Sequence, residues 1–365
     1  MTRISEIIDH FESIAPVLLQ ESYDNSGLQV GQADAEIGSV LLTVDVTEAV
    51  IDEAVQKKCN LIIAHHPVIF SGLKKLTGNS DVERVIIKAV KNDIAIFIAH
   101  TNLDAAAGGV NAKICEKLGL LNPKVLQPIS GQLKKLVTFI PFDAAEHVRE
   151  SVFKAGAGHI GNYDWCGYNT EGTGSFRGSE DSNPFVGEKG KIHYEKEIRF
   201  ETIFPGWLQK RIVQALIDSH PYEEVAYDIY PLENFLPNTG MGMLGVLPEP
   251  LDEMEFLNKI KSVFGSGCVK HTALRRKIIS RVAVCGGSGS FLLKKAISER
   301  ADFFISSDFK YHQFFDAEGK IVIVDVGHFE SEQFTNELFY ELLVKIFPKF
   351  AIRFSEVNTN PVSYF

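Results

Sequence analysis

The chain has 365 residues, of which 45% are hydrophobic, and its 47 acidic and 37 basic side chains give a formal net charge of -10. This composition excludes a disordered, collagenous or coiled-coil protein, and the length exceeds the roughly 250–300 residues at which a single core stops growing, so we expect two domains or one domain with an insertion. The acidic balance disfavours nucleic-acid binding, which needs clustered Lys and Arg, but it is compatible with a small anionic substrate held by a metal.

The five cysteines are odd in number, scattered along the chain and without a CxxC pair. This pattern argues against a disulfide framework and against a thiolate zinc site, and it suits a reducing compartment. The N-terminal residues lack the apolar core of a secretory signal, and no apolar run reaches the roughly 18 residues that a membrane span needs. We therefore expect a cytoplasmic protein that does not bind membranes.

The first third of the chain alternates apolar runs with helical patterns. Apolar residues at helical spacing predict a helix over residues 4–11, and a second helix is expected at about 81–91. The nearly continuous apolar runs at 39–46, 60–64 and 94–99 are typical of strands that are buried on both faces. Short buried strands alternating with helices predict a mainly parallel α/β sheet.

The pattern changes after Leu126, where a stretch rich in Gly, Asn and Ser interrupts alternating strands and helices. We expect strands at 134–141, 196–204 and 223–232, helices at 143–155 and 206–219, and the irregular stretch at 156–190. This order is ferredoxin-like if a fourth strand lies in the irregular stretch.

The first pattern returns near the C-terminal end, with apolar strands, turns and helices at 281–309 and 321–343. The expected architecture is therefore one α/β domain, built from residues 1–127 and 241–365, interrupted by an inserted α+β domain at 128–240.

Histidines follow two of the N-terminal apolar runs. The tetrad AHHP places His65 and His66 at the carboxyl end of a strand, where open α/β sheets bind ligands. The next run ends at His100, and Asp104 follows it. The ordinary alternatives are solvated loop histidines and, for Asp104, a helix cap.

A third cluster follows the apolar run IVIVDV, where His328 and Glu332 are four residues apart. On a helix this spacing places their Cβ atoms about 5–6 Å apart on one face, which suits chelation. The alternative is an exposed pair in which Glu332 and Glu330 interact with the positive helix N-terminus. Three strand-end clusters in a chain with only 11 histidines favour a shared metal site.

Imidazole and carboxylate ligands without thiolate suit zinc, manganese, iron or nickel. Five ligands exceed the needs of one tetrahedral zinc ion with an open position, whereas two ions about 3.5–4 Å apart with a bridging carboxylate would use them all. We therefore predict two divalent ions per chain, with zinc favoured. Because such a pair lowers the pKa of a bridging water, the expected reaction class is hydrolysis.

Weaker signals lie elsewhere in the chain. The segment CGGSGS at 285–290 follows a strand and opens a helix, so Gly286, Gly287 and Ser288 either bind an anion through backbone N–H groups or form a tight turn. Further candidates for orienting ligands, contacting substrate or transferring protons are Asn25, Asp45, His100, Asp308 and His312.

Six segments, in their order along the chain, resemble the motifs of the NIF3-like family, also called GTP cyclohydrolase 1 type 2 homologs. They are YDNSGLQVG, AHHP, AHTNLDAAAGGVN, CGGSGS, SSDFKYHQF and DVGHFESE. The inserted block, with HPYEEVAYDIYPLEN, is similar to the PII-like or CutA-like module of longer family members. The resemblance implies a dinuclear metal site formed by His65, His66, Asp104, His328 and Glu332.

The resemblance also implies a toroidal homohexamer, built as a trimer of dimers, and hydrolytic opening of the guanine imidazole ring of GTP. In that reaction a metal-activated water would attack C8, and a side chain such as His100 would carry protons. The alternative function is a metal-binding regulatory or scaffold ring, with a ligand-sensing insert and protein partners. Nucleic-acid binding through the ring is disfavoured by the acidic balance.

Overall fold

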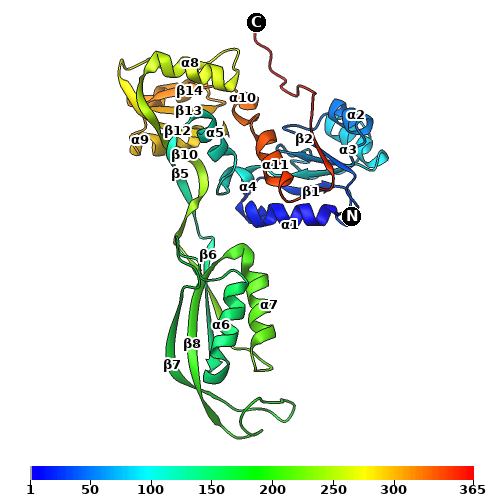
Figure 1. Cartoon of the computed structure of the whole chain (residues 1–365), viewed down its shortest axis with the longest axis vertical. Helices are drawn as coiled ribbons and strands as arrows, with labels where there is room; N and C mark the ends of the chain where they lie inside the picture. Colours follow the sequence, from blue (N-terminus) through cyan, green and yellow to red (C-terminus); the bar gives the residue numbers. More distant parts are fainter. Residues whose placement is uncertain (1) are drawn as a thin grey trace. The chain divides into compact units, whose positions relative to one another are not determined.

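The computed structural model describes residues 2–365 and divides by its contacts into two compact units (Figure 1). Unit 1 consists of Met1–Pro128 and Pro237–Phe365, and unit 2 consists of Ile129–Leu236. The chain thus leaves unit 1 once and returns to it once.

Unit 1 contains two mixed sheets. The five-stranded sheet has the order β1 (Gly27–Val30), β4 (Ala95–Ile98), β3 (Leu61–Ala64), β2 (Ser39–Thr43) and β15 (Ala351–Phe354). All its neighbouring strands are parallel except β1 and β4. The six-stranded sheet has the order β11 (Lys270–His271), β14 (Val322–Asp325), β13 (Phe303–Ser307), β12 (Ile278–Ser288), β10 (Phe235–Asp252) and β5 (Leu121–Ser130). Here β12, β13 and β14 are parallel, whereas β10 and β11 pair antiparallel with them.

Helices cover both sheets of unit 1. They are α1 (Ile4–Ile14), α2 (Glu48–Gln56), α3 (Asp81–Lys91), α4 (Thr101–Ala105), α5 (Val110–Leu118), α8 (Glu253–Phe264), α9 (Leu293–Ser298), α10 (His328–Glu332) and α11 (Thr335–Val344). The largest core combines side chains from both sheets with apolar faces of α1, α5, α8 and α11. Two smaller cores lie under α2 and α3 on one sheet and under α9 on the other. The parallel strands β2, β3, β4, β13 and β14 are therefore buried on both faces, which explains their continuous apolar runs, whereas the edge strand β15 is largely exposed.

Unit 2 is a four-stranded antiparallel sheet with two helices. The elements follow the order β6 (Leu133–Pro141), α6 (Ala145–Lys154), β7 (Gly167–Phe176), β8 (His193–Pro205), α7 (Gln209–Ser219) and β9 (Tyr227–Leu232), and the strand order is β7-β8-β6-β9. Strand β7 lies inside the irregular stretch 156–190. The two helices pack on one face of the sheet over Phe200, Phe204 and Leu136, which gives unit 2 a hydrophobic core of its own.

No helix within residues 2–365 has the length and apolar character that crossing a membrane requires.

Candidate metal centre

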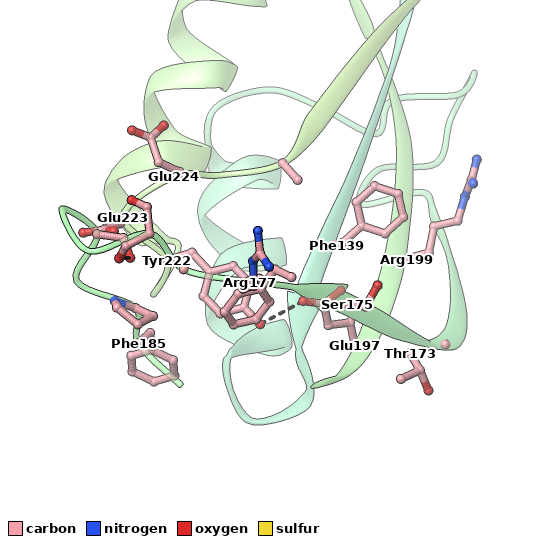
Figure 2. Close-up of a pocket in the computed structure, with 18 of the residues that line it drawn as sticks. Phe139, Thr173, Ser175, Arg177, Phe185, Glu197, Arg199, Tyr222, Glu223 and Glu224 are labelled. Atoms are coloured by element: carbon pink, nitrogen blue, oxygen red, sulfur yellow. Dashed lines mark hydrogen bonds between the residues drawn. The ribbon is translucent and has the colours of Figure 1, made fainter. Parts of the chain in front are cut away.

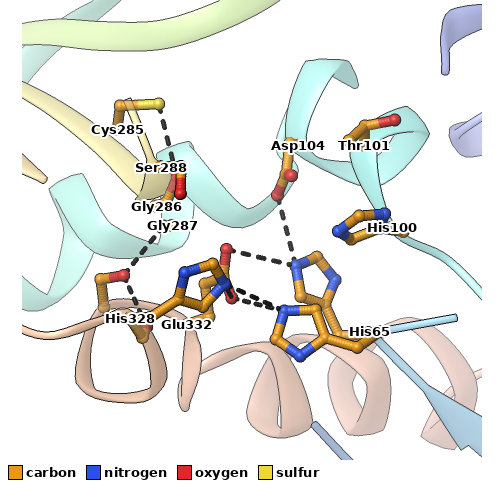
Figure 3. A network of polar contacts seen from close by, with 12 residues as sticks. His65, His100, Thr101, Asp104, Cys285, Gly286, Gly287, Ser288, His328 and Glu332 are labelled. Carbon is orange, nitrogen blue, oxygen red and sulfur yellow. Dashed lines mark hydrogen bonds and ion pairs between the residues drawn. The ribbon is translucent and has the colours of Figure 1, made fainter. Parts of the chain in front are cut away.

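The candidate site lies in unit 1, where the carboxyl ends of parallel strands from both sheets converge. His65 and His66 directly follow β3, and Asp104 lies on the short helix α4 after β4. His328 and Glu332 are the first and last residues of α10, which follows β14. Figure 3 shows the imidazole of His65, the carboxylate of Asp104 and the side chains of α10 directed toward one another.

His65 is fully buried, and its two ring nitrogens have different surroundings. Nδ1 lies 2.8 Å from the backbone oxygen of Ala99, which can only accept, so Nδ1 carries the proton. Nε2 then presents a lone pair, yet it lies 3.7 Å from carboxylate oxygens of both Asp104 and Glu332. Nε2 of His65 and Oδ1 of Asp104 are buried without a hydrogen-bond partner among the described residues. Acceptors that face acceptors in a buried space form an arrangement that a cation between them would stabilise.

His66 and His328 repeat this arrangement. Nδ1 of His66 is bonded to Asp45 at 2.7 Å, and Nδ1 of His328 is bonded to Asp308 at 2.6 Å. Their Nε2 atoms lie 3.3 Å apart, and both are near Oε2 of Glu332, at 2.8 Å for His66 and 3.1 Å for His328. Because Nδ1–H of each ring donates a hydrogen bond to a carboxylate, Nε2 of each neutral ring carries a lone pair, and these lone pairs would repel one another unless a proton or a metal lies between them.

Glu332 connects the two groups of ligands. Its Oε1 faces His65, and its Oε2 faces His66 and His328. Two sets of ligand atoms, each mutually within 4.8 Å, share this carboxylate: one from His65, Asp104 and Glu332, the other from His66, His328 and Glu332. Both carboxylate oxygens of Glu332 are therefore placed where they could be metal ligands.

The pKa shifts of the cluster show how strongly it attracts positive charge. Burial opposes a charge on His66, but hydrogen bonds to Asp45 and Glu332 outweigh it and raise the pKa of His66 to about 10. Burial raises the pKa of Asp104 to about 7, although His65 opposes this shift. Burial also acts to raise the pKa of Glu332, but His65 and the other histidines hold it well below its usual value. In the metal-free chain, protons therefore occupy positions that a cation would take.

Asp45 and Asp308 accept hydrogen bonds from the Nδ1 atoms of His66 and His328, on the side of each ring that faces away from Glu332. Asp45 follows β2 and accepts a hydrogen bond from Thr359 Oγ1 at 2.7 Å on its second oxygen. Asp308 follows β13, has a positive φ of 59° and accepts a hydrogen bond from the Ser288 hydroxyl. Carboxylates that accept from Nδ1 fix the tautomer and orientation of a ligating imidazole. The structure thus places both predicted aspartates where they can orient His66 and His328.

In the segment CGGSGS, the backbone N–H groups of Gly286 and Gly287 already donate hydrogen bonds within the protein. The N–H of Gly286 donates to Asn111 Oδ1 at 3.0 Å, and the N–H of Gly287 donates to Ser331 Oγ at 2.9 Å. These two donors are therefore already used within the protein. Cys285–Ser288 are the last residues of β12, whose register with β13 shifts between Val284 and Ser288.

Gly287, near the end of β12, has a steric function next to the candidate ligands. Gly287 has a φ of +59°, and a Cβ atom at this position would lie 2.2 Å from Oε1 of Glu332. Only glycine leaves room for the carboxylate in its observed place. The segment therefore forms one wall of the site.

His100 lies beside the cluster and is held by a residue that the sequence analysis missed. Its ring centroid is 5.2 Å from that of His65 and 5.5 Å from that of His66. Nδ1 of His100 is bonded at 2.8 Å to Asp24, which also accepts from the N–H of Thr101 at 3.1 Å. Asp24 precedes Asn25 in the turn-rich segment YDNSG. The carboxylate in this segment was the one sequence feature that could have indicated a partner for His100.

Asn25 and His312 do not join the cluster. Asn25 is exposed and donates from Nδ2 to the backbone oxygen of Ile69 at 2.6 Å. His312 is exposed on a 3-10 helix, Tyr311–Ala317, and its ring contacts are with Tyr311 and Phe315. Among the described residues, neither Asn25 nor His312 therefore contacts a candidate metal ligand.

A cavity of about 350 Å³ opens beside His66 and His328. Its walls include Lys270, which pairs with Asp325 at 2.7 Å, and the C-terminal residues Asn360 and Tyr364. The segment after β15 has no helical or strand periodicity, so only the folded structure places it here. The cavity is large enough for a small molecule in contact with both histidines.

Comparisons with known proteins agree with the motifs. The model of the Duf34/NIF3 (NGG1p interacting factor 3) family matches residues 2–361. A Bacillus subtilis protein named GTP cyclohydrolase 1 type 2 homolog is 39% identical over 365 residues, 98% of each chain. A protein of the same name from Halalkalibacterium halodurans is 41% identical over 325 residues, 88% of this chain and 87% of that one.

A solved structure has the same mixed α/β fold with several sheets. The crystal structure of a Bacillus cereus protein related to NIF3 covers 100% of this chain and 99% of that chain, with 38% identity and a TM-score of 0.85. The family resemblance predicted from the motifs is confirmed, and the chain belongs to the Duf34/NIF3 family.

Proposed function

We propose that this chain is a dinuclear metal-dependent hydrolase. The proposal rests on Glu332, whose two carboxylate oxygens face two different sets of imidazole and carboxylate ligands. One ion would be held by His65, Asp104 and Oε1 of Glu332, and the other by His66, His328 and Oε2. Ligands of this kind suit zinc, which we favour, as well as manganese, iron or nickel.

The residues around the ligands have distinct roles in this proposal. Two divalent ions supply charge stabilisation and an acidified water when they are bound. Asp45 and Asp308 keep the Nε2 lone pairs of His66 and His328 directed at the site. His100, held by Asp24, lies close enough to the cluster to carry a proton to or from a substrate. The cavity beside the cluster would bind the substrate.

We propose a nucleotide or similar small anion as the substrate. The relatives from B. subtilis and H. halodurans are named as homologs of a GTP cyclohydrolase, which makes GTP and opening of its guanine imidazole ring the first reaction to test. Bound divalent ions would make the site positive although the chain as a whole is acidic.

Unit 2 supports a second candidate function, that of a metal-binding regulatory or scaffold protein. In this candidate the inserted domain senses a ligand, and the toroidal homohexamer binds protein partners. The βαββαβ order and the strand order of unit 2 are those of a ferredoxin-like domain, and we propose that this unit is the PII-like insert implied by the sequence. A homohexamer built as a trimer of dimers remains part of this proposal. We also propose a cytoplasmic location, which the five free cysteines favour.

The test combines metal content with turnover. Protein loaded with zinc or manganese should contain two ions per chain by elemental analysis and should release product from GTP or from a nucleotide panel. Glu332→Gln should lose at least one ion and reduce turnover by more than about 100-fold, because the shared carboxylate is removed. Glu330→Gln, on the same helix but outside both ligand sets, should keep two ions.

The outcomes separate the two candidates. Two ions retained in Glu332→Gln would contradict the site assignment. Two ions in the native protein with no turnover of any nucleotide in the panel would contradict the hydrolase proposal and favour the regulatory protein.

A further inference from the structure

Unit 2 contains a cavity that the proposed hydrolase does not use. Its volume is about 770 Å³, compared with about 350 Å³ for the cavity beside the metal ligands. Figure 2 shows its lining residues, which come from β6, β7, β8 and the loops that follow β7 and α7. A volume of this size suits a small organic molecule.

Glycines on β7 create the floor of this cavity. Gly172 pairs with Glu197 across β7 and β8, so both positions are on the same face of the sheet. A Cβ atom at Gly172 would have no atom within 4 Å, so the sheet surface is bare there. Gly174 lies two residues further along, where a Cβ atom would be 2.1 Å from Oε2 of Glu197. The side chains missing from β7 therefore leave room both for the cavity and for the carboxylate.

Glu197 is the polar group at this floor. Its residue is only 7% exposed, yet it lines the cavity. Oε1 accepts a hydrogen bond from the Tyr222 hydroxyl at 2.8 Å, which is the one side-chain bond to this carboxylate recorded among the described residues (Figure 2). Burial and this hydrogen bond raise the pKa of Tyr222, so the phenol stays protonated and donates. A largely buried carboxylate with one donor can accept further N–H groups.

Aromatic rings line the cavity around the carboxylate. Phe139 lies on β6, on the same face of the sheet as Glu197, because it pairs with Arg199 two residues further along β8. The ring centroids of Phe176 and Phe185 lie 6.1 Å and 6.3 Å from that of Tyr222. Rings of this kind bind flat apolar groups and cations through their faces.

The charges on the lining favour a cation. Three glutamates of the lining, Glu197, Glu223 and Glu224, accompany two arginines, Arg177 and Arg199. A fourth glutamate, Glu171, pairs with Ile198 and so is on the other face of the sheet. One of the arginines, Arg199, is already paired at 2.9 Å with a carboxylate outside the lining, that of Glu201. The lining therefore carries an excess of negative charge around its aromatic rings.

We propose that unit 2 binds a small planar organic cation, an aromatic or heteroaromatic ring that carries an amidine or amine group. The N–H groups of the cation bond the free oxygen of Glu197, and its ring packs against Phe139, Phe176 and Tyr222. This site is separate from the metal centre, since all of its residues belong to unit 2.

The test uses benzamidine as the probe, with benzoate and benzamide as its anionic and neutral analogues. Titration calorimetry on the metal-loaded full chain should show saturable binding of benzamidine, with both analogues at least about tenfold weaker. Glu197→Gln should weaken benzamidine binding by about tenfold or more. Glu195→Gln is the matched control, because Glu195 is on the same face of β8 but does not line the cavity.

A second variant keeps the test informative if Glu197→Gln fails to fold. Gly172→Leu places a side chain in the open space and should abolish binding without a clash. Glu332→Gln should bind benzamidine as the native chain does, which excludes binding at the metal centre.

Four results would overturn the proposal. The first is no saturable binding of benzamidine up to ~10 mM. The second is equal binding of benzoate, and the third is an affinity for benzamidine that is unchanged in both Glu197→Gln and Gly172→Leu. The fourth is self-association that Gly172→Leu abolishes while benzamidine does not bind, because a second copy of the chain would then occupy the cavity.

Discussion

His66 and His328 are the side chains whose charge state depends most on whether a metal is present. Without metal, their hydrogen bonds to carboxylates overcome burial and raise the pKa of His66 to about 10 and that of His328 to about 11. Both imidazoles are then protonated near neutral pH, and their Nε2–H groups face Oε2 of Glu332. Metal binding must displace these protons, so the affinity for metal should increase with pH.

The same shift predicts how the metal-free chain responds to pH. The pKa of His66 is raised above its unfolded value of about 6.5. Its stabilising contribution is therefore complete below about pH 6.5 and is lost as pH rises through about 10. The free energy of unfolding should differ more between the native chain and His66→Gln at pH 7 than at pH 10, measured with urea after removal of metal by a chelator. A difference that stays constant or widens would show that His66 is neutral in the metal-free fold.

At the scale of single residues, the sequence indicates which side chains lie near the site. It gives much less information about which of these side chains contact one another. An apolar run followed by histidine is a local pattern, so His65, His66 and His100 could be placed at strand ends. The contact between Glu332 and His65 joins residues that follow strands of two different sheets, and no local pattern predicts it. Asp24 was missed for the same reason, because only the folded chain brings it to His100.

The end of β12 illustrates how a backbone element shapes the site. It passes so close to α10 that Gly287 has no room for a side chain beside Glu332. The N–H of Gly287 also donates to Ser331 on α10, so the end of the strand and the helix are held together. The position of the Glu332 carboxylate thus depends on the conformation of a strand end that carries no candidate ligand itself.

Replacing Gly287, which is not a candidate ligand, should therefore displace the carboxylate of Glu332, which is one. Gly287→Ala should remove at least one ion, because its Cβ atom would overlap Oε1 of Glu332. Gly319→Ala is the control, since Gly319 has a similar φ of +67° but open space around its Cβ position. Both variants should lose roughly 1–2 kcal/mol of unfolding free energy from left-handed backbone strain, but only Gly287→Ala should lose metal by elemental analysis. Equal metal content in the two variants would contradict a steric role for Gly287.

At the scale of elements, strands with continuous apolar runs could be predicted and irregular strands could not. The helix expected at 81–91 is α3, and the run at 39–46 contains β2. In contrast, β10 is 18 residues long and includes the segment NTGMGMLGVLPEP, whose glycines and prolines resemble a loop. At Gly240 and Gly242 in β10, a Cβ atom would overlap Gln127 and Leu292. These contacts exist only in the folded chain, so the sequence alone does not indicate why glycine is needed there.

The whole molecule divides its two candidate sites between units that each have their own hydrophobic core. The candidate metal ligands come from the two segments of unit 1, on either side of unit 2 in the sequence. Unit 2 has a separate core under α6 and α7 and contains the larger cavity. A protein arranged in this way should tolerate the loss of one site without losing the other.

Deletion of unit 2 tests this independence. Strands β5 and β10 are neighbours in the six-stranded sheet, and a Cβ atom at Gly240 would lie 2.8 Å from the Cα atom of Pro128, so the cut ends are close. Replacing Ile129–Leu236 with a short Gly-Ser linker should leave a protein that unfolds cooperatively and retains the metal content of the full chain, because a short loop between neighbouring strands costs little entropy. The isolated unit 2 should bind benzamidine with the affinity of the full chain. Loss of metal from the deletion variant, measured by elemental analysis, would show that the metal centre depends on the insert.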